Sequence, residues 1–245
     1  MVAVLAAGTV AGAVNAVVGA GTLVTFSTLV ALGVSPLTAN VSNTVGLVAG
    51  SVASSVGYRV ELRTQRHRML RLAPAALGGG ITGAVLLLLL PSSAFDAIVP
   101  ILVLAGVLLV LIGPRVASRL ATPHDILGHG GVGLLVGVFA TGVYGGYFGA
   151  AQGVLLIALM GSLLDQDLQR VNALKNFLAA LVNAVAAVIF VFAAPVDWTI
   201  VGLLVVGSTI GGFVGAHFGR RLPQAPLRWF IVTIGVVAVV VLVTG

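Results

Sequence analysis

The feature that most constrains this chain is a glycine-rich stretch, Gly142–Gly153, that lies between two apolar segments. Five of its twelve residues are glycine. Glycine weakens a helix, and non-helical backbone is tolerated at membrane depth only where it is buried in protein or lines a cavity. The first half of the chain has a shorter counterpart at Val18–Thr22. Two such interruptions at corresponding positions predict a transport site, and the alternative is close helix packing through small residues.

The rest of the chain is apolar enough to place it in a membrane. Hydrophobic residues make up 59% of the 245 residues and charged residues only 7%, and runs such as Ile98–Ile112 carry no charge. A soluble domain of this size does not have such a composition. The net charge of +6 comes from short basic loops between apolar segments, so the positive-inside rule explains it without nucleic acid. We therefore expect a multi-pass protein of the cell membrane.

A shift of 132 residues aligns the two halves of the chain. It pairs residues of the same type at several places: Gly21 with Gly153, Asn40 with Asn172, Gly79-Gly80 with Gly211-Gly212, and Leu90-Pro91 with Leu222-Pro223. Matches of this kind predict an internal repeat. We expect a first transmembrane repeat over 1–112, a cytoplasmic linker over 113–128, and a second transmembrane repeat over 129–245.

Some apolar segments are too short to cross a bilayer. Segments 2–18 and 21–33 rise about 26 and 20 Å against a hydrocarbon core of about 30 Å. We expect these two segments to form one re-entrant hairpin, and 130–143 with 150–164 to form another. Three full crossings then remain in each half, and an odd number makes the repeats inverted. The predicted fold is an all-α polytopic membrane protein with two inverted repeats, each a glycine-broken re-entrant helical hairpin plus three transmembrane helices.

The basic residues support this topology. All twelve lysines and arginines fall in segments that it places on one face: 58–71, 113–128, 164–175 and 219–228. The other face carries Asp96 and Asp197. The positive-inside rule makes the first face cytoplasmic and puts both termini outside. A model with eight single crossings separates Arg220, Arg221 and Arg228 from the first basic loop and violates the rule.

Polar residues inside the apolar segments predict the binding site. Asn40 and Asn43 share one helical face, and the shifted helix carries Asn172, Lys175 and Asn176. Polar side chains in a membrane helix turn toward a partner or a wet cavity, although the alternative is hydrogen bonding between helices. Lys175, the only lysine, offers a fixed positive charge to an anion or else extends to the cytoplasmic interface. By the repeat, its counterpart is Asn43.

Further candidates lie near the two glycine breaks. Gly21 and Gly153 precede helical segments, whose N-terminal N–H groups favour anions. The full set of candidate substrate-binding residues is Gly19, Gly21, Thr22, Asn40, Asn43, Tyr144, Tyr147, Gln152, Gly153, Asn172, Lys175 and Asn176. Asn15 also lies near the first break.

Signals for catalysis or a cofactor are missing from the sequence. The chain has no cysteine, no Walker A motif and no carboxylate pair within a span, and its four histidines lack metal-ligand spacing. We therefore expect no cofactor, no metal and no enzymatic activity.

Four motifs of this sequence are similar to those of a known protein family. They are Gly19–Leu23, Ala39–Thr44, Tyr144–Gly153 and Val171–Phe177. Together they resemble the TauE/SafE family of sulfite and sulfonate transporters over nearly the whole chain. The family usually has a longer first run of glycines, an acidic residue where Gly145 stands, and a Pro-Gly pair where Ala150 and Ala151 stand. The resemblance implies transport of small organosulfur anions.

The sequence thus predicts a secondary transporter of small anions that works by alternating access at the repeat interface. The resemblance implies sulfite or organosulfonates as substrates. Two alternatives stay open, a channel-like anion facilitator and a non-transport intramembrane enzyme or assembly factor. The expected partners are the lipid bilayer and a small anion, while coupling to a proton or another ion and the oligomeric state stay open.

Overall fold

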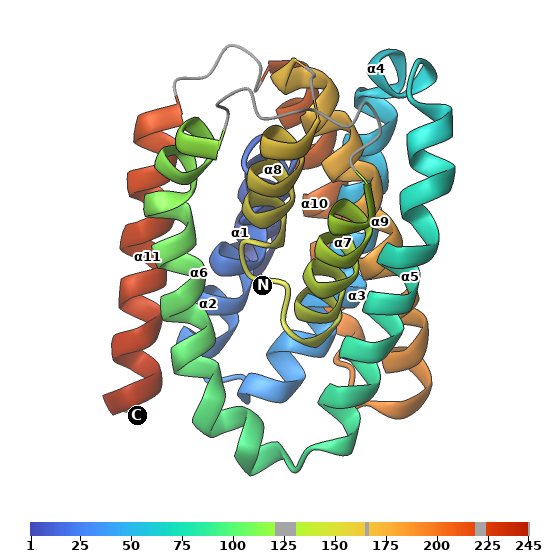
Figure 1. Cartoon of the computed structure of the whole chain (residues 1–245). Coiled ribbons are helices and arrows are strands. Elements are labelled where there is room, and N and C mark those ends of the chain that lie inside the picture. Colours follow the sequence, from blue (N-terminus) through green and yellow to red (C-terminus); the bar gives the residue numbers. More distant parts are fainter. Residues whose placement is uncertain (121–130, 165–166, 219–223, 245) are drawn as a thin grey trace.

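The computed structural model describes residues 1–120, 131–164, 167–218 and 224–244, with side chains described over 1–112, 131–164, 167–218 and 229–242. Every element in these ranges is an α-helix (Figure 1). The helices are α1 Val2–Val17, α2 Gly21–Ala31, α3 Pro36–Gly57, α4 Arg59–Arg63, α5 Arg66–Leu89, α6 Ser92–Leu120, α7 Gly131–Tyr147, α8 Gln152–Leu163, α9 Leu168–Ala193, α10 Trp198–Phe218 and α11 Gln224–Thr244. The prediction of an all-α polytopic membrane protein is confirmed.

Some of the described helices are long enough to cross a bilayer, and others are apolar but too short to do so. Four stretches are long and apolar enough to cross a bilayer: α5, residues 92–112 of α6, α9 and α10. Helices α1, α2, α7 and α8 are apolar but have only 11 to 17 residues. Helix α3 has 22 residues, but its stripe of asparagines and serines makes it less apolar.

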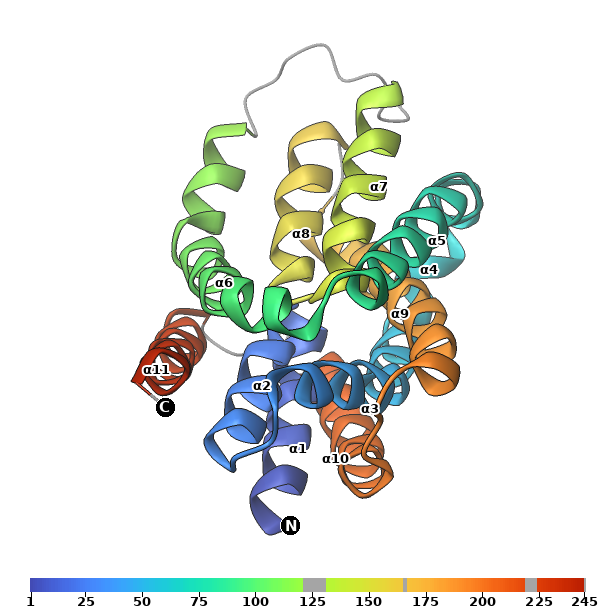
Figure 2. The same ribbon diagram turned by 90° about the horizontal axis from the view of Figure 1, so that it is seen from below.

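The short helices form two hairpins. Figure 1 shows α7 and α8 side by side, with their connection about midway between the two ends of the molecule. Helices α1 and α2 pack together in the same manner. Viewed from below, the two hairpins meet near the centre, between the pair α6 and α11 on one side and α3, α5, α9 and α10 on the other (Figure 2).

The two halves repeat the same order of helices. Helices α3 and α9, α5 and α10, and α6 and α11 begin 132 residues apart. Equivalent helices run in opposite directions, because α5 starts at the end where α4 lies and α10 starts at the other end (Figure 1). The contacts are also exchanged between the halves, since α1 packs on α10 and α7 packs on α5.

Close packing of glycines makes these exchanged contacts possible. An added Cβ at Gly211 would lie 1.9 Å from the Thr9 carbonyl oxygen, and one at Gly79 would lie 2.2 Å from that of Phe139. These contacts relate α1 to α7 by 130 residues, whereas α3 and the later helices follow the 132 shift. The break between the helices is longer in the second hairpin, with residues 148–151 in place of 18–20.

The structure changes two expected boundaries. Gly142 and Gly146 lie inside α7, where an added Cβ would meet the backbone of α5 at 3.0 and 2.2 Å. The packing explanation therefore holds for these glycines, and the break is confined to residues 148–151. Helix α6 continues to Leu120, so the first part of the expected linker is helical, and 121–130 lie outside the described residues.

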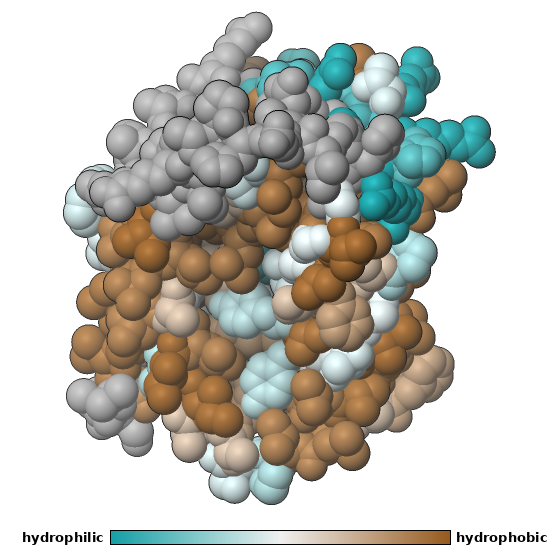
Figure 3. Space-filling model, viewed as in Figure 1, coloured by the Kyte–Doolittle hydropathy of each residue, from teal (hydrophilic) through white to brown (hydrophobic). Residues whose placement is uncertain are grey.

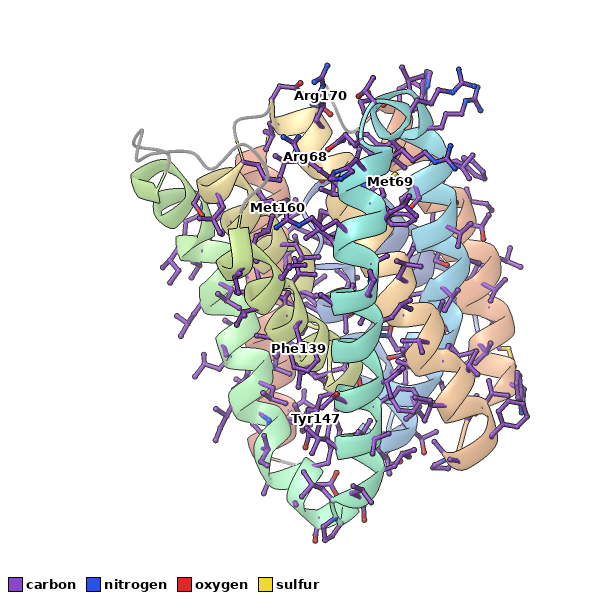
Figure 4. The ribbon with its side chains drawn as sticks, turned by 45° about the vertical axis from the view of Figure 1, so that its right-hand side comes forward. Arg68, Met69, Phe139, Tyr147, Met160 and Arg170 are labelled. Carbon is purple, nitrogen blue, oxygen red and sulfur yellow. The ribbon has the colours of Figure 1, made fainter. Side chains whose placement is uncertain are left out.

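Polar and apolar surfaces are separated along the molecule. Hydrophilic residues gather at the α4 end, and the visible face below is mostly hydrophobic (Figure 3). Arg68 and Arg170 lie at this end, well away from Tyr147 (Figure 4). Asp197 lies in the connection between α9 and α10, at the opposite end (Figure 1). The side chains of Arg115, Arg119, Arg220, Arg221 and Arg228 lie outside the described residues.

Candidate functional site

Left-handed residues form the turn in each hairpin. Gly19 has φ 82°, and Gly149 and Ala151 have φ 76° and 59° in the other hairpin. The two tips touch, because the Gly153 N–H donates to the Gly19 carbonyl oxygen at 3.0 Å. An added Cβ at Gly19 would lie 2.3 Å from the Gly153 Cα. Only glycine allows two backbones to approach so closely, so the contact between the hairpins requires glycine at both positions.

Three side chains of α9 donate hydrogen bonds to backbone carbonyls at the C-terminal end of α1. The Asn172 and Asn176 side-chain amides both donate to the Ala16 carbonyl oxygen at 3.1 Å. The Lys175 ammonium donates to the carbonyl oxygens of Asn15 and Ala16 at 2.7 and 3.3 Å. The last carbonyls of a helix carry partial negative charge, so they stabilise a buried cation there. Lys175 is only 1% exposed and thus does not extend to the interface.

The second hairpin is held in a related but different way. The Asn40 side-chain amide donates to the carbonyl oxygen of Tyr147, the last residue of α7, at 3.0 Å. The Tyr144 hydroxyl donates to the Ala150 carbonyl oxygen at 2.5 Å and so closes the break. Asn43, the repeat counterpart of Lys175, instead accepts a hydrogen bond from the Thr25 hydroxyl. The C-terminal end of α1 therefore binds a charged side chain, whereas the C-terminal end of α7 binds only a neutral amide.

A small cavity lies where the hairpin tips meet α3 and α9. Its volume is about 20 Å³, room for about one water molecule. Both halves of the chain line it: Asn15, Gly19, Thr22 and Ser51 from the first, and Gly149, Gln152, Gly153, Lys175, Asn176, Ala179 and Asn183 from the second. No carboxylate is among the lining residues.

One hydrogen bond locates this cavity relative to the repeat. The Asn183 side-chain amide donates to the Ser51 hydroxyl at 3.2 Å, and these residues are 132 positions apart. Two residues related by the repeat contact each other only near the axis that relates the two halves. Ser51 and Asn183 both line the cavity, so residues that the 132 shift pairs meet there.

The cavity offers hydrogen-bond donors. An ammonium group has three N–H donors, and the protein accepts from two of those of Lys175, through the Asn15 and Ala16 carbonyls. The Gln152 side-chain amide nitrogen is buried and has no partner among the described residues. A positive charge and a spare amide donor, with no carboxylate beside them, suit a small oxyanion.

The structure thus brings part of the predicted set together. Gly19, Thr22, Gln152, Gly153, Lys175 and Asn176 line the cavity, and Asn15 joins them. Gly21, Asn40, Asn43, Tyr144, Tyr147 and Asn172 lie outside its lining. The Gly21 N–H donates to the Asn15 side-chain oxygen at 2.8 Å, and the Gly153 N–H is bonded to Gly19, so neither N–H is free for an anion.

Sequence reasoning left Ser51, Gly149, Ala179 and Asn183 out of the site. Ser51 and Asn183 occupy the same polar stripes as the predicted asparagines, and their spacing of 132 residues was a signal that would have found them. Among the residues that the structure describes, no three histidine, aspartate or glutamate side chains group to hold a metal ion.

Comparisons with known proteins agree with a transport role. Similar proteins include "Probable membrane transporter protein YfcA" of Escherichia coli (strain K12), 25% identical over 93% of this chain and 83% of its own length. "Probable membrane transporter protein ORF9" of Sinorhizobium sp is 27% identical over 88% of this chain and 80% of its own length. A "Probable membrane transporter protein" of Haemophilus influenzae is 23% identical over 92% and 87%. No solved structure matches the chain.

These relatives identify a membrane transporter rather than an enzyme. The model of the family described as "Sulfite exporter TauE/SafE" matches residues 4–242. Because that match covers nearly the whole sequence, the chain belongs to the sulfite exporter TauE/SafE family.

Proposed function

We propose that this protein is a secondary transporter of small oxyanions, with sulfite or organosulfonates as substrates, and that it binds them in the cavity between the hairpin tips. The observation that carries the proposal is Lys175, a fully buried cation that lines this cavity beside the spare donor of Gln152. A lysine inside a membrane is costly by roughly 3 kcal/mol on insertion scales, so its retention there favours a functional role. The family name points to the same class of substrate.

Alternating access is the mechanism that fits the cavity. With a volume of about 20 Å³, it holds about one water molecule, so an anion with several oxygens fits only when the tips separate. The two halves, 1–112 and 129–245, contain equivalent helices that run in opposite directions, as inverted repeats require. Rocking of one repeat against the other would open the cavity first to one side and then to the other.

The proposed orientation follows from charge. The described arginines of α4 and the start of α5 lie at one end of the molecule, and the α9–α10 connection with Asp197 lies at the other. By the positive-inside rule the α4 end is cytoplasmic. The C-terminal end of α11 lies away from α4, on the side that we propose to be external (Figure 1).

Flux measurements in liposomes test the proposal. The purified protein would be reconstituted, and uptake of labelled sulfite measured with and without sulfite, an alkyl sulfonate or a carboxylate loaded inside. We expect saturable uptake that internal sulfite or sulfonate accelerates and that the carboxylate leaves unchanged. Uptake that does not saturate and shows no acceleration would instead establish a channel-like facilitator. Acceleration by the carboxylate alone would reassign the substrate.

A further inference from the structure

A large groove lies outside the proposed transport site, between α3, α4, α5 and α9. Its volume is about 640 Å³, far larger than the cavity at the hairpin tips. Its walls are almost wholly apolar, with Val52 and Val56 of α3 facing Phe177 and Leu181 of α9. Val52 and Val56 are also exposed on the molecular surface, at 48% and 43%. The groove therefore opens on the surface of the helices, where lipid surrounds a membrane protein.

Three arginines stand around one end of this groove. Arg59 and Arg63 come from α4, and Arg66 begins α5. All three are exposed. None of their side chains makes an ion pair or a hydrogen bond with another described residue, whereas the Arg170 side chain pairs with Asp167 at 3.3 Å. The groove thus joins an apolar channel to a cluster of free guanidinium groups.

This combination fits one class of ligand. Guanidinium groups bind phosphate oxygens in a bidentate manner, and an apolar groove beside them suits a hydrocarbon chain. Basic pockets between transmembrane helices bind the head groups of anionic lipids. A soluble phosphate compound would leave the apolar walls unused. We propose that this groove binds an anionic phospholipid, with the phosphate on Arg59, Arg63 and Arg66 and one acyl chain along α3 and α9.

The other half of the protein lacks this cluster. The repeat pairs Arg59 with Val191, Arg63 with Pro195 and Arg66 with Trp198. The arginine cluster therefore has no counterpart at the paired positions of the second half, and the proposed lipid site belongs to the leaflet at the α4 end. Trp198, which is 61% exposed, is the kind of residue that anchors a helix at the opposite interface.

Native mass spectrometry of the purified protein tests the site. The protein would be mixed with phosphatidylglycerol and phosphatidylcholine in detergent, and the bound fraction of each lipid measured. We expect preferential retention of phosphatidylglycerol. Replacing Arg59, Arg63 and Arg66 together by glutamine should weaken that binding by about fivefold for each arginine, or on the order of 100-fold in total. Equal retention of the two lipids by the parent protein would overturn the proposal.

Matched variants separate the groove from general surface charge. Arg63→Gln should weaken phosphatidylglycerol binding about fivefold, and Arg170→Gln, at the same end of the molecule, should leave it unchanged. Ala184→Phe fills the groove without changing charge and should also lose the lipid, whereas Val188→Phe, outside the groove on the same helix, should not. Equal loss in Arg63→Gln and Arg170→Gln, or normal binding in Ala184→Phe, would refute a built site. Displacement of the lipid by glycerol phosphate at equal concentration would refute the role of the acyl chain.

Discussion

At the scale of single residues, the contact between Gly19 and Gly153 decides how closely the hairpins approach. Alanine at Gly19 needs a left-handed backbone, at about 1–2 kcal/mol, and its Cβ would lie 2.3 Å from the Gly153 Cα. Gly33 is a matched control, because it has φ 84° but no atom within 4 Å of an added Cβ. We expect Gly33→Ala to lower stability by about 1 kcal/mol with flux retained, and Gly19→Ala to abolish flux and lower the melting temperature further. Equal flux and melting temperature in the two variants would contradict a steric role for Gly19.

Lys175 joins two roles in one side chain, since it binds the end of α1 and faces the cavity. Lys175→Gln removes the insertion cost of roughly 3 kcal/mol and loses charged hydrogen bonds worth about 1.5–3 kcal/mol. These effects nearly offset each other, so we expect little change in melting temperature. The affinity for sulfite should fall about 10- to 100-fold, and Lys175→Arg should keep part of it because the charge persists.

The two measurements together distinguish the roles of Lys175. A lower melting temperature with unchanged apparent affinity in Lys175→Gln would show that the lysine only holds α1. Transport at the parent rate in that variant would move the substrate site away from Lys175.

At the scale of helices, much of the architecture could be predicted from the sequence. The short apolar segments predicted hairpins whose boundaries lie within a few residues of α1, α2, α7 and α8, and the 132 shift matches the starts of α3 and α9. The helical course of Gly142–Tyr147 could not be predicted, because it depends on α5, whose backbone fills the space that Gly142 and Gly146 leave. The partners of Asn40 and Asn172 could not be predicted from the sequence either, because each side chain binds a carbonyl in the other half of the chain.

The hydrogen bonds that Asn40 and Asn172 donate to the opposite half lead to a prediction about how the hairpins are held. Asn40→Ala leaves the partly buried Tyr147 carbonyl without its amide donor, which costs about 1–3 kcal/mol. Asn172→Ala also removes the 3.0 Å hydrogen bond from its amide to the Tyr58 hydroxyl. It should cost less at the end of α1, because Asn176 and Lys175 still donate to the Ala16 carbonyl. Thermal unfolding in detergent would measure both, with Thr82→Ala as an exposed control that loses only a bond within its own helix. A larger loss in Asn172→Ala than in Asn40→Ala would show that these amides do not act chiefly as helix caps.

At the scale of the whole molecule, the exchanged contacts explain why residues of both halves line the proposed substrate cavity. Helix α1 packs on α10 and α7 on α5, so each hairpin is held by the opposite half. The hydrogen bond between Ser51 and Asn183, which the 132 shift pairs, lies at the lining of the cavity. Under the proposed alternating access, a movement that opens the cavity to one side would have an equivalent that opens it to the other. Lys175 lies on the second half alone and would make the charge in the cavity asymmetric.

The orientation in the membrane gives the last prediction. The chain has no cysteine, so single cysteines can be introduced without a background. Arg66 begins α5, Gln224 begins α11 and Ser92 begins α6. The proposed topology of three crossings per half would place positions 66 and 224 on the cytoplasmic side and position 92 outside. An impermeant thiol reagent applied to intact cells should label a cysteine at position 92 only, and disrupted cells should show labelling at all three. Labelling of position 224 but not 66 in intact cells would reinstate the model of eight single crossings, because only that model separates the two basic loops.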